Sequence, residues 1–143
     1  MTEFARPAPI DARVVAVVAV GGGIGAVARY GLAVWLPHRP ESVPWGTFLA
    51  NVTGCLAIGV LMVLITEVWR SPHRLIRPFL GVGVLGGFTT FSSYSAEVRT
   101  LLESGTTAVA FGYLVGTVVV CLGAVVAGMG LTRRITGRRD GTT

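Results

Sequence analysis

Residues 81–97 read Gly-Val-Gly-Val-Leu-Gly-Gly-Phe-Thr-Thr-Phe-Ser-Ser-Tyr-Ser-Ala-Glu, and this stretch decides how the rest of the chain is interpreted. It places a glycine pair, a run of hydroxyl side chains and three aromatic rings inside an otherwise apolar segment. A bilayer core offers no water to backbone N–H and C=O groups, so such a segment cannot face hydrocarbon. We therefore expect it to interrupt its helix and to be buried in protein or line a polar cavity. That is the usual place for an ion site in a membrane protein.

The sequence on both sides of this segment is strongly apolar. Mean hydropathy is +0.69, and only 13% of the residues are charged, where soluble domains carry about a quarter. The apolar runs predict a single domain of four transmembrane helices, because each run approaches or exceeds the ~20 residues that a bilayer core requires. Their approximate bounds are 12–36, 44–69, 75–103 and 106–132. The expected fold class is thus an all-α membrane protein whose third helix is broken mid-membrane. So thin a monomer has little room for an enclosed pore, and we expect it to oligomerise.

The distribution of positive charge predicts an orientation. All twelve basic residues are arginines, and most fall in segments that would be cytoplasmic if both termini lie inside: Arg6, Arg13, Arg70, Arg74, Arg77, Arg133, Arg134, Arg138 and Arg139. The outer connections hold only Arg39 and Arg99. By the positive-inside rule this bias predicts a multi-pass cell-membrane protein in one fixed orientation, with cytoplasmic N and C termini. We interpret the arginine-rich tail as a topology anchor and not as a nucleic-acid site.

The first span contains a glycine cluster and the one basic residue at membrane depth. Residues 21–26 match a dinucleotide-binding fingerprint, but no second βα unit follows, and close helix contact through small residues explains the glycines better. Arg29 lies within the same span and needs a partner or a route to the interface. We expect it to snorkel to the interface or to cap helix-end carbonyls; a direct part in attracting anions is the alternative.

Two stripes of weakly polar residues, each spaced four apart, mark the second and fourth spans. Their members are Thr47, Asn51 and Cys55, and Tyr113, Thr117 and Cys121. Residues four apart share one helix face. Asn51 must find partners, because burying an unpaired amide costs about 1–3 kcal/mol; an interhelical packing bond and a pore-facing donor are both open. The two cysteines are expected to be small buried residues with no disulfide between them.

Taken together, four motifs resemble the CrcB/Fluc family of fluoride channels. They are residues 86–95 in the third span, residues 22–30 in the first, Gly46, Thr47, Asn51 and Gly54 in the second, and the stripe of the fourth. The resemblance covers nearly the whole chain, in order. It implies a passive, fluoride-selective channel that exports fluoride from the cytoplasm and so reduces its toxicity. It also implies an antiparallel dimer with two pathways along its interface.

The same resemblance assigns residues to the pathway and to a metal site. Phe91 and Tyr94 match the family's paired phenylalanines, and an aromatic ring has a positive edge that can hold an anion weakly. Asn51 would donate its amide, and Thr47, Tyr113 and Thr117 their hydroxyls. The backbone carbonyls of Gly86 and Thr89 match a central, structural Na⁺ site shared between the two chains; hard cations favour oxygen ligands.

The chain also departs from the family pattern. Tyr94 stands where the second phenylalanine is usual, and its hydroxyl could bind fluoride or narrow the path. Cys121 replaces a hydroxyl residue at the end of its stripe. The lopsided arginine distribution disfavours insertion in both directions, so we expect pairing with an oppositely oriented homologue; a homodimer is the alternative.

A small multidrug or metabolite antiporter is the main competing interpretation, because such proteins also have four helices. They resemble one another in an acidic residue near the middle of the first span, and this first span has none. Glu97 lies near the outer end of the third span instead. An enzyme is not expected, since both histidines, His38 and His73, fall in connections.

Overall fold

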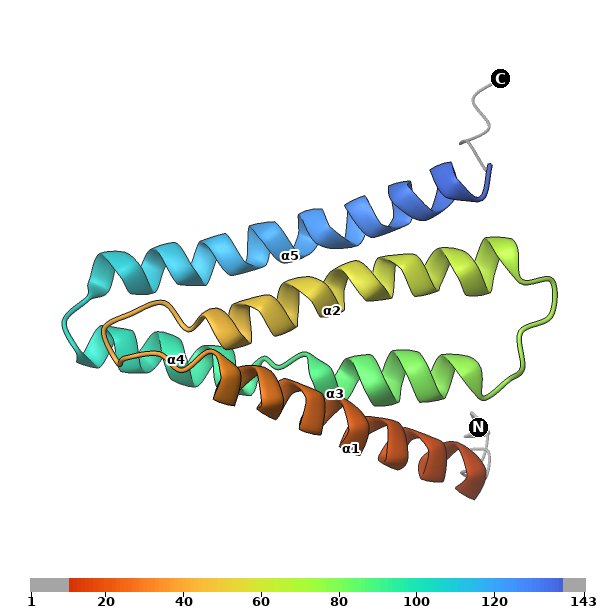
Figure 1. The fold of residues 1–143 in the computed structure, drawn as a ribbon, viewed down its shortest axis with the longest axis horizontal. Helices are drawn as coiled ribbons and strands as arrows, with labels where there is room; N and C mark the ends of the chain where they lie inside the picture. The colour runs from red at the N-terminus through yellow and green to blue at the C-terminus, as the bar shows by residue number, and fades with distance from the viewer. Residues whose placement is uncertain (1–10, 138–143) are drawn as a thin grey trace, which may run out of the picture.

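The computed structural model describes residues 11–137, whose regular secondary structure is entirely helical (Figure 1). The elements are α1 (Ala12–Trp35), α2 (Trp45–Val63), the π-helical turn η1 (Leu64–Val68), a second π-helical stretch η2 (Arg77–Leu85), α3 (Gly86–Phe88), α4 (Ser92–Glu103) and α5 (Thr107–Ile135). Three of the arginines used to predict the orientation, Arg6, Arg138 and Arg139, lie outside the described residues.

The long elements lie side by side as a bundle, with α1 running against α2 (Figure 1). The η2–α3–α4 segment returns in the direction of α1, and α5 then runs parallel to α2. Consequently the start of α1 and the end of α5 lie at the same end of the bundle. Because α2 and α5 run in the same direction, their polar stripes, each spaced four residues apart, can lie level with one another along the bundle.

Local sequence sets the helix ends. Asp11 caps α1 by accepting a hydrogen bond from the backbone N–H of Arg13 at 2.9 Å. Pro37 and Pro40 follow α1, where the missing N–H of proline disfavours further helix. Gly105 has a φ of +80°, which L side chains rarely adopt, and it turns the chain between α4 and α5.

The segment quoted first from the sequence is interrupted in the structure. Helix α3 ends at Phe88, the backbone of Thr89 is extended (φ −82°, ψ 156°), and α4 begins at Ser92. Three helices are long and apolar enough to cross a membrane, namely Ala12–Trp35, Trp45–Val68 and Thr107–Ile135. The third expected span does not qualify as one continuous helix, because the interruption divides it into pieces that are each too short. Those pieces nevertheless follow one another along the bundle (Figure 1).

Small residues allow the helices to approach closely. A Cβ atom at Gly25 of α1 would overlap the Val84 carbonyl oxygen, and one at Gly87 of α3 would overlap the carbonyl oxygen of Gly22. On the other side of the bundle, a Cβ at Gly59 would overlap the Val125 carbonyl oxygen of α5. Close backbone contact of this kind is the usual means of helix association where lipid removes the hydrophobic driving force.

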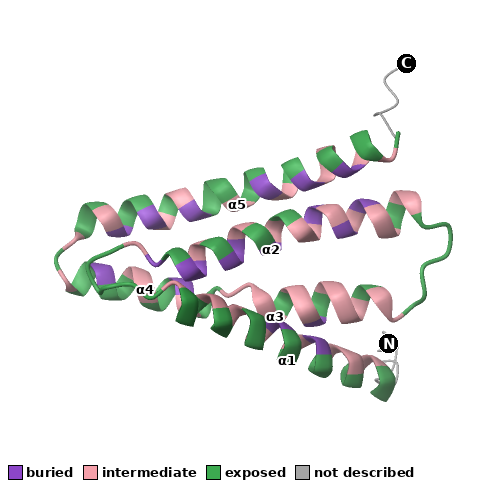
Figure 2. Ribbon diagram, viewed as in Figure 1, coloured by how far each residue is buried: buried purple, intermediate pink, exposed green. Residues whose placement is uncertain are grey.

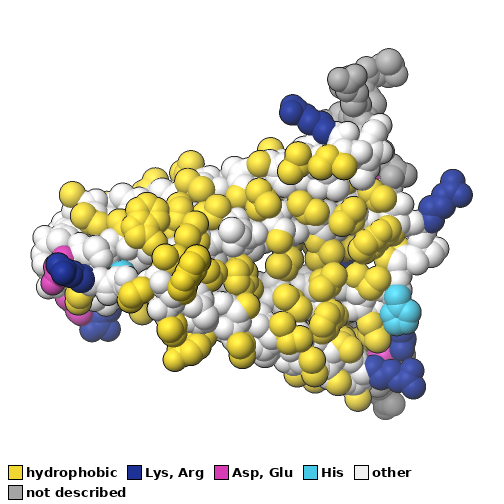
Figure 3. Space-filling view, in the orientation of Figure 1, with side chains coloured by type: hydrophobic (Ala, Val, Ile, Leu, Met, Phe, Trp, Pro, Cys, Tyr) yellow, Lys and Arg dark blue, Asp and Glu magenta, His cyan; other side chains and the backbone are white. Residues whose placement is uncertain are grey.

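The outer surface is apolar along the bundle and charged at its ends. Large side chains such as Val27, Val119 and Leu122 are exposed along α1 and α5 (Figure 2), and hydrophobic atoms cover most of the face shown in Figure 3. At one end, Arg74 pairs with Asp11 at 3.2 Å and Arg133 pairs with Glu67 at 2.8 Å. This surface is that of a protein whose sides contact lipid.

Candidate functional site

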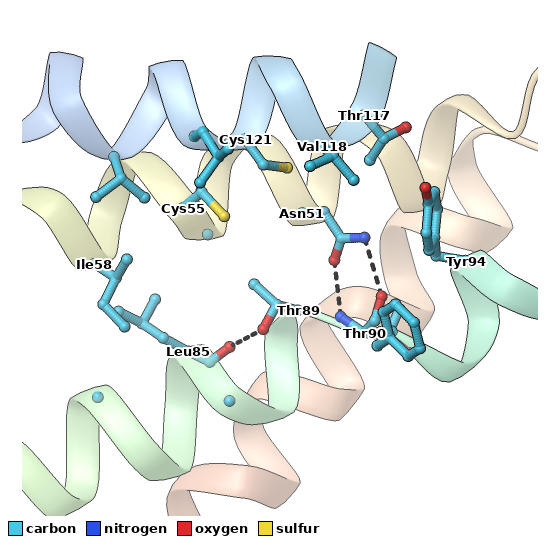
Figure 4. Close-up of a pocket in the computed structure, with 16 residues that line it drawn as sticks. Asn51, Cys55, Ile58, Leu85, Thr89, Thr90, Tyr94, Thr117, Val118 and Cys121 are labelled. Carbon is cyan, nitrogen blue, oxygen red and sulfur yellow. Dashed lines mark hydrogen bonds between the residues drawn. The ribbon is translucent and has the colours of Figure 1, made fainter. Parts of the chain in front are cut away.

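A pocket of about 500 Å³ opens beside the interruption (Figure 4). It is bounded by α2, by η2 and α3, by the start of α4 and by α5. Six of the residues predicted for the pathway and the metal site line it: Asn51, Gly86, Thr89, Phe91, Tyr94 and Thr117. The structure therefore brings the third-span motif together with one polar residue from the second span and one from the fourth.

Asn51 of α2 pairs with the backbone where the helix is broken. Its Nδ2 donates to the Thr90 carbonyl oxygen at 3.0 Å, and its Oδ1 accepts from the Thr90 N–H at 2.8 Å (Figure 4). One amide side chain thus satisfies both backbone groups of a residue that has left the helix. The amide has a second N–H, and Asn51 borders the pocket. Asn51 therefore makes the interhelical bond expected of a packing residue, and the second hydrogen of its Nδ2 can still be donated.

The interruption also redirects the amides that would bond Gly86 and Thr89 in a continuous helix. Thr90 N–H, four residues after Gly86, donates to Asn51. Ser93 N–H, four residues after Thr89, donates to the Thr90 hydroxyl at 3.2 Å. The carbonyl oxygens of Gly86 and Thr89 therefore lose their usual helical donors. Two backbone oxygens at a helix break, close to one pocket, are the donor type that a hard cation prefers.

Arg29 of α1 caps the broken helix. Its Nε donates to the Gly87 carbonyl oxygen at 3.2 Å and its Nη1 to the Ser93 hydroxyl at 3.4 Å. The guanidinium bonds to residues on both sides of the interruption. This is the helix-capping role that we expected for Arg29 from its place in the first span. Arg29 does not border the pocket itself.

Thr117 differs from the other polar residues of the pocket because its hydroxyl has no partner. The residue is 3% exposed, and its Oγ1 is the one buried side-chain nitrogen or oxygen among residues 11–137 without a hydrogen-bond partner. Leaving such a group unpaired costs about 1–3 kcal/mol. The residue lines the pocket, and its hydroxyl is not committed to another group among residues 11–137.

The two aromatic residues of the motif lie together but differ in burial. Their ring centroids are 5.9 Å apart, with Tyr94 4% and Phe91 79% exposed. The Tyr94 hydroxyl donates to the carbonyl oxygen of Leu114 at 2.5 Å. The hydrogen of this hydroxyl is therefore engaged with α5. Phe91 presents its ring to the outside of this single chain.

Thr47 and Tyr113 were also predicted for the pathway, and both are buried one helical turn away from the pocket. They meet at a residue to which the sequence argument gave no role in the site. The Thr47 hydroxyl donates to Glu97 Oε1 at 2.6 Å, and the Tyr113 hydroxyl donates to Glu97 Oε2 at 2.8 Å. Glu97 joins α2, α4 and α5 through these bonds. Its position three residues after Tyr94, on the face of α4 that carries that ring, is the signal that could have identified it.

The stripes on α2 and α5 continue to the cysteines. Cys55 follows Asn51 by one turn on α2, Cys121 follows Thr117 by one turn on α5, and both border the pocket (Figure 4). We expected small buried residues, but both are half-buried because the pocket opens next to them. Both thiols are free.

These features define a small helical membrane protein built around a broken helix, with a pocket of uncharged donors at the break. Residues 16–129 match the family described as "CrcB-like protein, Camphor Resistance (CrcB)". The chain belongs to this family. It is 56% identical over 137 residues to a protein of Nocardia farcinica named "Fluoride-specific ion channel FluC 2", covering 96% of this chain and 97% of the relative.

Other relatives carry similar names. A "Fluoride-specific ion channel FluC 1" of Streptomyces coelicolor is 51% identical over 87% of this chain and 80% of its own length. A "Fluoride-specific ion channel FluC" of Rhodospirillum centenum is 46% identical over 85% of this chain and 96% of its own.

Proposed function

We propose that this chain forms a fluoride-specific ion channel of the cell membrane, and not an enzyme, through which fluoride leaves the cytoplasm passively. Membership of the CrcB family and the names of the relatives support this function. The observation that carries it in the structure is the buried, unpartnered hydroxyl of Thr117, a residue that lines the same pocket as Asn51 beside the broken helix. Both groups offer a hydrogen to an anion.

The donors suit a small anion that must also be released. Asn51, Thr117 and the edges of the Phe91 and Tyr94 rings carry partial positive charge and no full charge. Conduction requires binding that replaces hydration yet remains weak enough for the ion to move on. Thr47 and Tyr113 lie one turn further along the same stripes, where both hydroxyls donate their hydrogens to the Glu97 carboxylate. The proposed pathway therefore runs along the facing stripes of α2 and α5 past the start of α4.

The single chain does not enclose this pathway, which supports a dimer. The Phe91 ring, at the edge of the pocket, is 79% exposed. An antiparallel partner that packs on this side would cover the ring and close the pocket, and symmetry would give two pathways. In this arrangement η2, α3 and α4 together make the third crossing in chain order, so that each subunit spans the membrane four times.

The freed carbonyls of Gly86 and Thr89 fit the structural Na⁺ implied by the family. Each chain supplies two backbone oxygens at the break, and a second chain would supply two more. A bound Na⁺ would tie the two interruptions together without moving along the pathway. Arg29 supports the same region by holding Gly87 and Ser93, and its charge would also favour anions nearby. Four carbonyls from two chains form a coordination set of the hard, uncharged type that Na⁺ accepts.

The arginine distribution supports one orientation in the cell membrane, with both termini cytoplasmic. The end of the bundle where α1 begins and α5 ends also carries Arg13, Arg74, Arg77, Arg133 and Arg134, whereas Arg39 and Arg99 lie at the other end. A chain inserted in one direction needs an oppositely oriented homologue to form an antiparallel pair. A homodimer requires insertion in both directions.

Fluoride efflux from liposomes tests the function directly. Vesicles loaded with potassium fluoride, with valinomycin added to let potassium follow, should release fluoride to an external electrode when they contain the purified chain, alone or with an oppositely oriented homologue. Chloride-loaded vesicles should release little. The proposal would be overturned if neither preparation, the chain alone or the chain with its homologue, released fluoride.

The antiporter alternative makes a different prediction in the same vesicles. A proton-coupled exchanger moves its substrate when a pH gradient is imposed without valinomycin, whereas a channel needs the potassium pathway to balance charge. Fluoride release that follows the pH gradient and ignores valinomycin would favour the exchanger. The acid-free first span supports the channel.

A further inference from the structure

The pocket contains a pair of thiols to which the proposed function assigns no donor role. The chain has two cysteines; Cys55 lies on α2 and Cys121 on α5, and both border the same pocket (Figure 4). The parallel course of α2 and α5 places the two residues at the same level of the bundle. Close packing near Gly59 and Gly128 holds the two helices together one turn or more beyond the pair.

We propose that Cys55 and Cys121 form a binding site for a soft divalent metal ion that takes two thiolates in a linear arrangement, with Hg²⁺ as the type. Binding breaks two S–H bonds, forms two Hg–S bonds and releases two protons to water, and no atom changes oxidation state. Thiolate sulfur is the ligand that soft metal ions prefer.

Charge and ligand number select this class of ion. Two thiolates neutralise one divalent ion, and a neutral complex avoids the large cost of placing a charge at membrane depth. A monovalent soft ion such as Ag⁺ would leave a net negative complex there. Zinc prefers four ligands, and residues 11–137 contain no group of three or more His, Cys, Asp or Glu side chains that could hold a metal ion.

Metal bound at this site should also block fluoride movement through the pocket, and this part of the inference rests on the proposed function. Cys55 lies four residues after Asn51 on α2, and Cys121 lies four residues after Thr117 on α5. Each separation is about 6 Å along the helix axis. An ion bridging the thiols would occupy the end of the pocket next to the donors proposed to hold fluoride. Hg²⁺ should therefore stop fluoride movement while it is bound.

A titration of the reduced full-length chain in detergent with Hg²⁺ tests the site without transport. The near-ultraviolet absorption of mercury–thiolate bonds should saturate at one Hg²⁺ per chain. Because the second thiol binds at high effective concentration, wild type should retain Hg²⁺ against an about 100-fold higher concentration of competing monothiol than C55S or C121S. Saturation at two Hg²⁺ per chain, or equal release from wild type and both single variants, would overturn the inference.

Fluoride efflux with and without Hg²⁺ then tests the consequence. Efflux through wild type should fall at least tenfold in Hg²⁺ and return when a dithiol chelator is added, whereas the ratio of the two rates should stay near one for C55S/C121S. A bound ion that leaves wild-type efflux unchanged would contradict the obstruction. Absence of efflux before any metal is added would instead contradict the proposed function, and the titration would still decide the site.

Discussion

Among single residues, Thr117 combines two properties that a purely structural threonine does not combine. It is almost completely buried, and its hydroxyl lacks a partner within residues 11–137. A threonine that only packs would bond back to a carbonyl of its own helix, as Thr132 does to Gly128 at 2.8 Å. Under the proposed function, the unpaired Thr117 hydroxyl is a donor that would meet its partner when an anion enters.

Replacing Thr117 with valine should separate function from stability. The change removes an unsatisfied buried group and keeps the shape, so the free energy of unfolding should stay the same or rise by about 1 kcal/mol. Fluoride efflux should fall at least tenfold, about 1.4 kcal/mol in the barrier. T132V, on the same helix, is the matched control and should conduct normally. Normal efflux through T117V would remove this residue from the pathway.

For Tyr94 we expect the reverse of the Thr117 result, namely a loss of stability with little change in fluoride efflux. Its hydroxyl bonds to the Leu114 carbonyl, while its ring lies next to Phe91 at the pocket. Replacing Tyr94 with phenylalanine should therefore lower the free energy of unfolding by about 1 kcal/mol and leave fluoride efflux within about twofold of wild type. Liposome efflux and denaturation of the same preparation measure both quantities. A large loss of efflux with unchanged stability would show that the hydroxyl faces the ion.

The elements show which features of the fold the sequence could supply. Glycines and hydroxyl residues at membrane depth predicted an interruption in residues 81–97, and the structure interrupts the helix at Thr89. The partners at this break could not be predicted, because they come from other helices. Asn51 satisfies Thr90, and Glu97 joins Thr47 to Tyr113, only after α2, α4 and α5 have packed. Periodicity placed each stripe on one face but could not say which carboxylate it would meet.

The glycines of α1 allow a prediction about how this element supports the break. A Cβ at Gly25 would overlap the Val84 carbonyl oxygen and the Phe88 backbone nitrogen, whereas one at Gly23 has no atom within 4 Å. G25A should therefore destabilise the protein by about 1–3 kcal/mol, because backbone atoms must move. G23A, the control, should be neutral or stabilising by up to about 1 kcal/mol. Equal effects of both substitutions on the unfolding free energy would contradict the tight α1–α3 contact.

At the scale of the whole molecule, hydropathy identified the long helices but the charges distinguish the two ends. The salt bridges of Asp11 with Arg74 and Glu67 with Arg133 occupy the end at which α1 begins and α5 ends. Even with these acids, that end keeps the larger number of arginines (Figure 3). Sequence alone could predict this asymmetry because it requires only the order of the spans. It could not predict that the Phe91 ring is exposed at the side of the single chain, because that exposure depends on how the helices pack.

The asymmetry predicts that insertion in cells is unidirectional. Tags placed at the two termini should be protected from an impermeant reagent in intact cells and react after the membrane is opened. A tag in the connection of residues 37–41, between α1 and α2, is the control and should react in intact cells. Detergent-purified protein enters liposomes in both directions, so the chain alone could form antiparallel pairs there even where its insertion in cells is unidirectional. If insertion is unidirectional, cells that express this chain alone should remain fluoride-sensitive. Co-expression with an oppositely inserted homologue should restore efflux. Equal labelling of both termini from both membrane faces, together with efflux from the chain alone, would establish a homodimer instead.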